Sequence, residues 1–563
     1  MIPGLRGGGS ITRHHPATVT ILVLLVALVA GCAPRREGSD LLNRALSERA
    51  RSRPATGSET RPEAIGSTRV ETLVPPSALR GADGLACHAG RAFVSEEFVD
   101  RIREVRADGS LATVAMPRTV EGPAHLAFDE SGNLFVAARR SGSVWRRSPG
   151  GDWKELARDL YGLSGLSVSA GRVWLSHCGV EDAISVLDPG ATPRRVAENL
   201  GCPTGLLAEG NTLYVPLVES GEVLRIETAS GARSRVASGL EVPVAVRRGP
   251  AGALLVLEAR SGRVREINGQ SDAGPGIPRT RLAPGVSDLA TCSDSVLTVN
   301  SIWASVDAQK PWPSAPRSLV AGGLVLPQGA ALFGNTLLLS DGRSIKRLRG
   351  ETLELLAAWR LTEGLPRPSG LTIGGDGAAY ISVPEEGRIF RLDIPSGSAA
   401  EFSSALRWPT SLDRLWSGEL AVAETGTGQV LKIGPGGEWW PMAYSLLSPV
   451  ALVTDGARLL VSEPAGGRVL SLREERMPLS IVSGLAQPSG LAVGPRHRIF
   501  IAERGTGELA VRNTDGSRRT LVRDLALGGA RGEFPLEIPL VTRPDGSILL
   551  AAPGDGSVLE IRP

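Results

Sequence analysis

A unit of about forty residues recurs twelve times along most of the chain. Its form is clearest between Pro203 and Ile226, where a Pro-x-Gly turn is followed by three short apolar runs separated by Gly-containing turns. Turns that open a unit begin at residues 82, 123, 163, 203, 243, 286, 327, 368, 409, 449, 488 and 535. A fourth run, rich in Arg, Val and Leu, usually follows. Alternation with period two, broken regularly by Gly, predicts short β-strands and not helices.

Four short strands in each repeat of this length are typical of a β-propeller. One twisted sheet has two apolar faces, and stacking the sheets in a ring buries both faces between neighbours. The 69 Gly and 40 Pro residues fall at regular turns, which fits many short strands better than disorder. We therefore predict an all-β fold, a tandem pair of six-bladed β-propellers that follows a signal peptide and a disordered tether.

The two ends of the repeat region suggest how the rings close. The region opens with a lone strand of the fourth type at 69–74 and ends with a strand of the third type at 558–561. An unpaired outer strand exposes backbone N–H and C=O groups that can pair with other chains. We therefore expect 69–74 to complete the sixth unit and a strand at 318–321 to complete the twelfth. A single twelve-bladed ring and a seven-plus-five division are the alternatives. The predicted domains are a signal peptide at 1–31, a lipidated flexible tether at 32–66, a first propeller at 67–313 and a second at 314–563.

The N-terminus carries the pattern of an exported protein. The apolar run 21–30 is shorter than the roughly 20 apolar residues that a transmembrane helix needs. It leads into Val29-Ala30-Gly31-Cys32. This sequence resembles the lipobox of bacterial lipoproteins. The resemblance implies cleavage before Cys32, attachment of lipid chains such as palmitate to Cys32, and a membrane anchor without a transmembrane helix. An ordinary signal peptide with a chance Cys is the alternative. We expect the protein in the cell envelope, facing the periplasm or the exterior. Because Ala33 follows the Cys, we expect sorting to the outer membrane.

Charge and cysteine content limit the remaining choices. A net charge of +3 without a dense basic run does not favour a nucleic-acid partner. Four further cysteines in an exported chain permit disulfides. Cys178 and Cys202 fall at the end of one unit's second strand and the start of the next unit, where a bond is plausible, with free thiols as the alternative. Cys87 and Cys292 hold similar positions in units one and six, which are neighbours only if the first ring closes at six.

The patterns P-x-G-L, G-x-L-x-V-x-E and G-x-V-x-x-I resemble NHL-type repeats and the related six-bladed propellers of gluconolactonases and virginiamycin B lyase, over roughly residues 68–563. The resemblance implies a fold but no single activity, because this superfamily includes hydrolases, lyases and binding modules. Lactonase-like members hold a divalent cation such as Ca²⁺ at the axis through E-G-P and P-N-G motifs. Glu121-Gly122-Pro123 matches the first motif.

The chain departs from the second motif and from that of the lyase. Thr204, Ser369 and Ser489 stand where P-N-G has its Asn, and a hydroxyl is a poor substitute for the carbonyl oxygen that a hard cation prefers. The Glu-x-His pair of the lyase has no counterpart in the repeat units. We therefore expect no cofactor, with a cation at a propeller axis as the alternative and the metal unknown.

Side chains at the starts of first strands and the ends of second strands share one face of a propeller, around its channel. The candidates for axial ligand binding are Glu96, His125, His177, Glu258, Asn300, Asp341, Glu424, Glu463 and Glu503, with Asp83 and Asp288 on the same face. The carboxylates can accept backbone N–H bonds and hold the ring together, or they can bind a cation or basic ligand. His125 and His177 are candidates for acid–base work or metal ligation, or for a hydrogen-bonding role.

These observations predict a membrane-anchored lipoprotein that acts as a binding or scaffold propeller for a protein, peptide or glycan. The alternative is a metal-dependent, lactonase-like hydrolase or a lyase with a site on the axis of one ring. An enzyme of this kind needs a cation held by several oxygens and a base near the substrate. A binder needs only exposed side chains on its loops.

Overall fold

The computed structural model describes residues 62–179, 181–250, 252–269, 274–310, 312, 314–358, 367–473, 476–528 and 537–563. The signal peptide, Cys32 and nearly all of the tether lie outside these residues, so the predictions made for them stay predictions. Within the described ranges the strands form twelve antiparallel sheets, eleven with four strands and one with five. The same residues contain three short 3₁₀ segments, η1 (Glu97–Val99), η2 (Pro384–Glu386) and η3 (Pro495–His497), and no helix that could span a membrane. The predicted all-β fold is confirmed.

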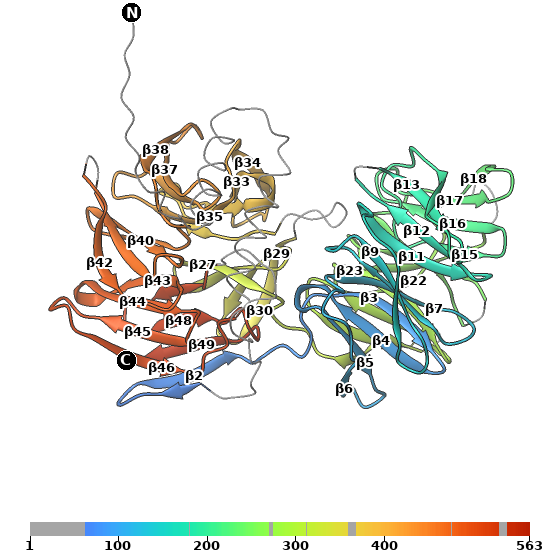
Figure 1. The fold of residues 1–563 in the computed structure, drawn as a ribbon, viewed down its shortest axis with the longest axis horizontal. Helices are drawn as coiled ribbons and strands as arrows, with labels where there is room; N and C mark the ends of the chain where they lie inside the picture. The colour runs from blue at the N-terminus through green and yellow to red at the C-terminus, as the bar shows by residue number, and fades with distance from the viewer. Residues whose placement is uncertain are drawn as a thin grey trace, which may run out of the picture. The chain divides into compact units, whose positions relative to one another are not determined.

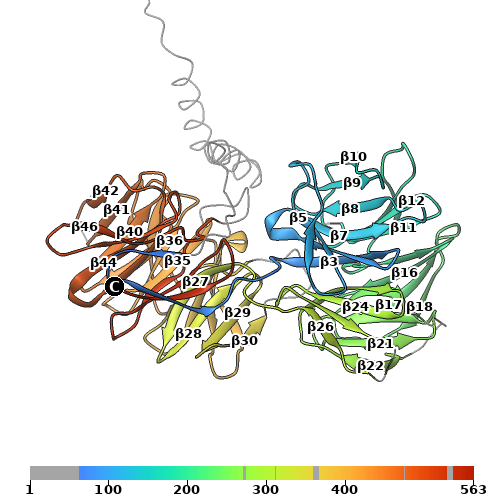
Figure 2. The same ribbon diagram turned by 90° about the horizontal axis from the view of Figure 1, so that it is seen from below.

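The first six sheets follow one another along the chain (Figure 2). Sheets 1 and 2 comprise β3 (Ala82–His88), β4 (Arg91–Glu96), β5 (Arg101–Val105) and β6 (Leu111–Thr113), then β7 (Pro123–Phe128), β8 (Leu134–Ala138), β9 (Ser143–Arg147) and β10 (Trp153–Ala157). Sheets 3 and 4 comprise β11 (Leu163–Ser169), β12 (Arg172–His177), β13 (Ala183–Leu187) and β14 (Arg194–Ala197), then β15 (Leu207–Glu209), β16 (Thr212–Leu217), β17 (Glu222–Glu227) and β18 (Arg233–Ala237). Sheets 5 and 6 comprise β19 (Pro243–Arg248), β20 (Leu254–Glu258), β21 (Arg263–Ile267) and β22 (Ile277–Arg281), then β23 (Val286–Cys292), β24 (Ser295–Asn300), β25 (Ser305–Gln309) and β26 (Arg317–Val320).

The last six sheets take in two strands from the beginning of the chain. Sheets 7 and 8 comprise β27 (Pro327–Phe333), β28 (Thr336–Asp341), β29 (Ser344–Arg349) and β30 (Thr352–Ala358), then β31 (Leu371–Ile373), β32 (Ala379–Val383), β33 (Arg388–Leu392) and β34 (Ala399–Ser403). Sheets 9 and 10 comprise β35 (Pro409–Arg414), β36 (Leu420–Glu424), β37 (Gln429–Ile433) and β38 (Trp439–Ala443), then β39 (Leu452–Asp455), β40 (Arg458–Glu463), β41 (Arg468–Leu472) and β42 (Leu479–Ser483). Sheet 11 comprises β43 (Pro488–Gly494), β44 (Arg498–Glu503), β45 (Glu508–Arg512), β46 (Arg518–Arg523) and β1 (Glu63–Ala64), and sheet 12 comprises β47 (Leu540–Thr542), β48 (Ile548–Ala551), β49 (Val558–Arg562) and β2 (Arg69–Val74).

Two rings of six sheets result, because first strands contact each other around each ring. In ring one, β3 lies against β23, and the Leu85 N–H donates to Asp288 Oδ2 at 3.1 Å across this junction. The Cys87–Cys292 disulfide spans the same junction, and a second disulfide joins Cys178 to Cys202. Both predicted bonds are confirmed. In ring two, β27 contacts β31 on one side and β47 on the other.

The strands that complete the rings are exchanged relative to the sequence-based prediction. The strand predicted at 318–321 is β26, which pairs with β25 inside ring one. The strand at 69–74 is β2, which pairs with β49 and completes ring two, as its blue ribbon beside the red strands shows (Figure 1). The boundaries 67–313 and 314–563 therefore assign both strands to the wrong ring. Both have the same alternating pattern, and only their pairing with distant or neighbouring strands distinguishes them.

The hydrophobic core lies between neighbouring sheets. One cluster joins Leu85 and Val94 of sheet 1 to Val299 and Val306 of sheet 6. Close packing also explains the Gly of the opening turns, since a Cβ on Gly370 would collide with the Thr410 carbonyl of the next sheet. The backbones of adjacent first strands meet at these positions, so only Gly fits.

Candidate functional site

The predicted carboxylates at the ends of second strands all accept a backbone N–H from the connection that leads into their own sheet. Glu96 accepts from Arg80 at 2.6 Å, and Glu463 accepts from Leu447 at 2.7 Å. The same contact recurs from Glu241 to Glu258 at 2.9 Å, from Val325 to Asp341 at 2.9 Å, from Arg407 to Glu424 at 2.6 Å and from Ala486 to Glu503 at 2.7 Å. Asn300 also accepts a backbone hydrogen bond, because its side-chain oxygen accepts the N–H of Ile302 at 3.0 Å.

Most of these carboxylates also have a cationic partner within their own sheet. Arg101 pairs with Glu96 at 2.9 Å, Arg265 with Glu258 at 3.0 Å and Lys346 with Asp341 at 2.5 Å, and Arg468 and Arg518 pair with Glu463 and Glu503. The described residues include no group of three or more His, Cys, Asp or Glu side chains placed to hold a metal ion. The contacts assign a structural role to these groups. Axial ligand binding by them remains an untested prediction.

The two predicted histidines lie in different surroundings. His177 is buried, with Nδ1 2.8 Å from the Tyr161 carbonyl and Nε2 2.7 Å from Ser185 Oγ, so both ring nitrogens have partners. His125 is 6% exposed and has Nε2 3.1 Å from Arg139 Nη2. Its Nδ1 is buried and has no hydrogen-bond partner among the described residues.

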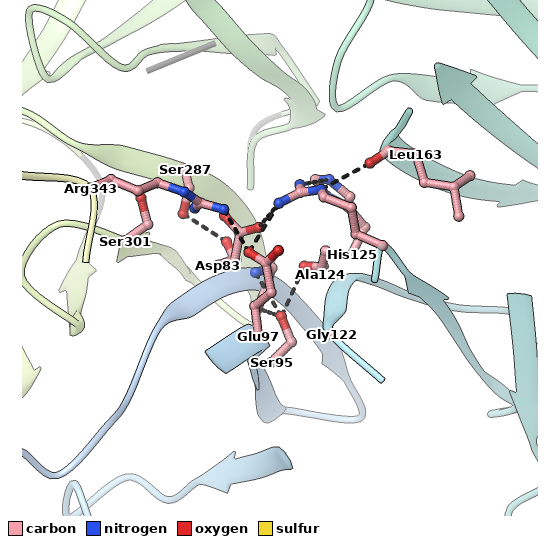
Figure 3. A network of polar contacts seen from close by, with 12 residues as sticks. Asp83, Ser95, Glu97, Gly122, Ala124, His125, Leu163, Ser287, Ser301 and Arg343 are labelled. Atoms are coloured by element: carbon pink, nitrogen blue, oxygen red, sulfur yellow. Dashed lines mark hydrogen bonds and ion pairs between the residues drawn. The ribbon is translucent and has the colours of Figure 1, made fainter. Parts of the chain in front are cut away.

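His125 belongs to a network of charged side chains on the predicted face of ring one (Figure 3). Arg139 is at its centre. One guanidinium nitrogen lies 3.0 Å from both Asp83 Oδ2 and Glu97 Oε2, and Nε donates to the Leu163 carbonyl at 3.0 Å. Arg343, from the turn between β28 and β29 of ring two, adds a second ion pair to Glu97 at 2.8 Å. The sequence pattern places Asp83 and His125 on this face, but it gives no signal for Arg139, Glu97 or Arg343.

Opposite charges in this network determine its protonation. Burial raises the pKa of Glu97, but the charges of Arg139 and Arg343 outweigh burial and lower it below its ordinary range. Burial, with the charge of Arg139, lowers the pKa of His125 well below its ordinary value. His125 is therefore neutral near pH 7. Because Arg139 donates to Nε2, the ring proton is on Nδ1, and this buried N–H has no acceptor among the described residues.

A groove on ring two was not predicted. It consists of two recesses of about 710 and 510 Å³ that share Thr514 in their walls. The walls come from turns between first and second strands and between third and fourth strands of sheets 10, 11 and 12. These turns lie on the face opposite the ends of second strands. Its lining includes Arg473, Arg496, Arg498, Arg512 and Arg562, and we call it the arginine groove.

Comparisons with known proteins support no assignment to a family. No protein-family model and no curated protein matches the sequence. Among solved structures, the chain is similar to the GH74 enzyme of Niastella koreensis, with 13% identity, a TM-score of 0.39, and coverage of 85% of this chain and 90% of that one. It is also similar to PorZ of Porphyromonas gingivalis, described as a surface component of the type-IX secretion system, with 12% identity, a TM-score of 0.30, and coverage of 87% and 86%. We draw no functional conclusion from similarities at this level.

Proposed function

We propose that this chain is a membrane-anchored lipoprotein whose propellers act as a binding or scaffold module for a protein, peptide or glycan. The arginine groove carries the proposal, because its two recesses, of about 710 and 510 Å³, are lined by polar and charged side chains of surface turns. The polar side chains on the opposite face instead contact the protein itself, as Glu463 does with the Leu447 N–H and Arg468. The lipobox-like sequence before Cys32 supports the anchor.

Binding and turnover can be measured on the same preparation. Full-length protein in detergent micelles is applied to peptide and glycan arrays, and hits are titrated by calorimetry. We expect saturable binding of at least one class of ligand. Lactone hydrolysis and bound divalent metal are measured in parallel, before and after dialysis against a chelator. Hydrolysis that is abolished by the chelator and restored by Ca²⁺ would contradict the proposal and favour a lactonase-like enzyme.

The anchor is tested by replacing the predicted acylation site. Cys32→Ser removes the thiol that would carry lipid, so we expect the variant to be absent from the washed membrane fraction or to lose its labelling by radioactive palmitate. Ser10→Ala, within the leader but outside the lipobox-like sequence, is the matched control and should behave as wild type. Membrane retention and palmitate labelling that persist in Cys32→Ser would show that the anchor is elsewhere.

A further inference from the structure

We propose that the arginine groove binds an acidic polysaccharide, a chain of sugars that carry carboxylate groups. The inference rests on the proposed binding function and names the class of its ligand. The two recesses share Thr514 in their walls, so they adjoin each other on the turns of sheets 10 to 12. Two adjoining recesses accommodate several units of an extended chain better than one small molecule.

The cations of the groove fall into two groups. Arg458 pairs with Asp455 at 2.5 Å, and Arg562 pairs with Glu560 at 2.9 Å. Four other guanidiniums, those of Arg473, Arg496, Arg498 and Arg512, form no ion pair with any described residue. A guanidinium presents planar donors that match a carboxylate in two-point contact. Arg498 and Arg512 donate to the carbonyls of Pro495 and Asn513 at 3.4 Å, and the Arg498 guanidinium lies over the Phe500 ring. Four guanidiniums without a carboxylate partner in one groove therefore favour a ligand with several anionic groups.

Hydrogen-bond acceptors lie among these cations. Asp515 Oδ1 accepts the Ser517 N–H at 2.8 Å, and Asp545 Oδ1 accepts the Ser547 N–H at 2.9 Å, so each carboxylate is fixed in its turn through one oxygen. The second oxygen of each has no partner among the described residues. These oxygens can accept from hydroxyl groups, but they would repel a dense phosphate backbone. Mixed cations and acceptors thus fit a hydroxyl-rich chain whose negative charges are spaced apart.

The turn that carries Arg496 has an unusual backbone. Arg496 and His497 both have positive φ angles, 59° and 55°. The corresponding turns of sheets 1 and 3 place Gly second, as in Ala89-Gly90, where Gly relieves the strain of this conformation. Sheet 11 instead holds two long side chains in the left-handed region and presents both of them to the groove. A strained turn that places a guanidinium in the wall of the groove is consistent with ligand contact.

Exposed indoles on the same face favour a sugar over other anions. Trp416, in the turn between β35 and β36, is 43% exposed, and Trp440, near the turn between β37 and β38, is 41% exposed. Sheet 9 is the neighbour of sheet 10 in the propeller. The two indoles therefore lie on the same face as the groove, on the sheet next to it. Aromatic faces stack on the apolar faces of sugars, whereas a small phosphate ligand has no apolar face that could stack on an indole.

The test uses full-length protein in detergent micelles and calorimetric titration. The probes are oligomers of galacturonate, mannuronate and glucuronate, and we expect at least one to bind, with affinity that falls as salt rises. Arg473→Ser with Arg512→Ser should weaken binding at least tenfold. The matched control, Arg281→Ser with Arg349→Ser, removes two exposed arginines outside the groove and should leave the affinity unchanged. The methyl-esterified oligomer, which keeps the sugar and loses the charge, should bind at least tenfold more weakly.

Several outcomes would overturn the proposal. They are absence of binding by all three uronate oligomers, equal affinity in the groove variant, and tighter binding of inorganic phosphate or glycerol 3-phosphate than of any uronate. Arg496→Asn is a second variant that keeps the turn geometry, and unchanged affinity in it and in the double variant would likewise exclude the groove. Thermal unfolding of each variant identifies loss of fold. If uronates fail but another array ligand binds, this inference falls and the binding function stands.

Discussion

Glu97 is the residue through which the network of ring one reaches ring two. Its side chain is mostly buried and lies 3.0 Å from Arg139 and 2.8 Å from Arg343. These cations offset the cost of burial, so the pKa of Glu97 falls below its ordinary range. The charged form of Glu97 is thus more strongly preferred in the folded chain than in the unfolded chain.

Glu97→Gln keeps the shape of the side chain and removes its charge. We expect the variant to lose about 3 kcal/mol of stability at pH 7, because two partly buried guanidiniums lose a partner. The stabilisation by the Glu97 carboxylate is complete at pH values above the pKa of a Glu side chain in the unfolded chain, about 4.3. It is lost as the pH falls towards the lower pKa that Glu97 has in the folded chain. The difference from wild type in urea unfolding should therefore shrink between pH 6 and pH 3. Glu104→Gln, in an exposed pair with Arg91, should cost about 1 kcal/mol or less. A difference for Glu97→Gln that does not vary with pH would contradict this account.

The sequence predicts which residues lie on the axial face, but it does not predict their partners. The repeat pattern places Asp83 and His125 there because first strands begin at the channel. Arg139 follows β8 with no repeated signal, and Arg343 comes from the other ring. Their convergence depends on how sheets and rings pack, which no local pattern contains. The arginine groove was missed for a related reason, since its arginines lie in separate turns of three sheets.

At the scale of the element, a Ser and a carboxylate at the end of a second strand hold a sheet in place. Ser95 Oγ donates to the Ala124 carbonyl of the next sheet at 2.9 Å, and Glu96 accepts from the connection into its own sheet. Ser176 and Ser382 make the same contact with the next sheet, to Thr204 and Thr410. At Ser95, Ser176 and Ser382 the hydroxyl therefore joins neighbouring sheets, whereas the carboxylate of Glu96 fixes the connection into its own sheet.

Glu463→Gln tests the contact between a strand-end carboxylate and its own sheet in ring two. Glu463 is fully buried, accepts from the Leu447 N–H at 2.7 Å and pairs with Arg468. The amide can still accept a hydrogen bond, but Arg468 loses its counter-charge, so we expect a loss of about 3 kcal/mol in urea unfolding. Glu354→Gln is the control, because its carboxylate is 37% exposed, unlike the fully buried Glu463, so its pair with Arg347 should contribute less than about 1 kcal/mol. Equal effects of the two variants would show that the strand-end carboxylate has no special role.

The turn at Arg496 leads to an opposite prediction for stability. Arg496→Asn replaces a residue that is strained at positive φ with one that tolerates this region, so we expect a gain of about 0.5–1 kcal/mol. Arg349→Asn, at the end of β29, should change stability by no more than about 0.5 kcal/mol. Chemical denaturation of both variants gives the comparison. A loss of stability in Arg496→Asn would mean that the Arg side chain compensates for its backbone through contacts within the protein.

At the scale of the whole molecule, the sequence predicts the number of sheets but misassigns the two strands that complete the rings. Period-two alternation and Gly turns are local, so they locate the units correctly, and β3, β7 and β27 begin at the predicted positions 82, 123 and 327. Ring closure depends on pairing over the full length of the chain. Strands β2 and β26 have the same alternating pattern, and the choice between them follows from β26 succeeding β25 directly while β49 has no later strand to pair with.

Deletion of residues 62–75 tests this closure. Without β2, the strand β49 becomes an unpaired edge, and the buried side chains of Leu559 and Ile561 lose cover. We therefore expect the thermal transition of ring two to fall by several degrees and its aggregation to rise. Ring one should unfold as before, because β26 and the Cys87–Cys292 disulfide close it without β2. Deletion of residues 40–53, within the predicted tether, is the control and should leave both transitions unchanged. If calorimetry instead shows that the ring-one transition falls, β2 completes ring one, as its position in the sequence first suggests.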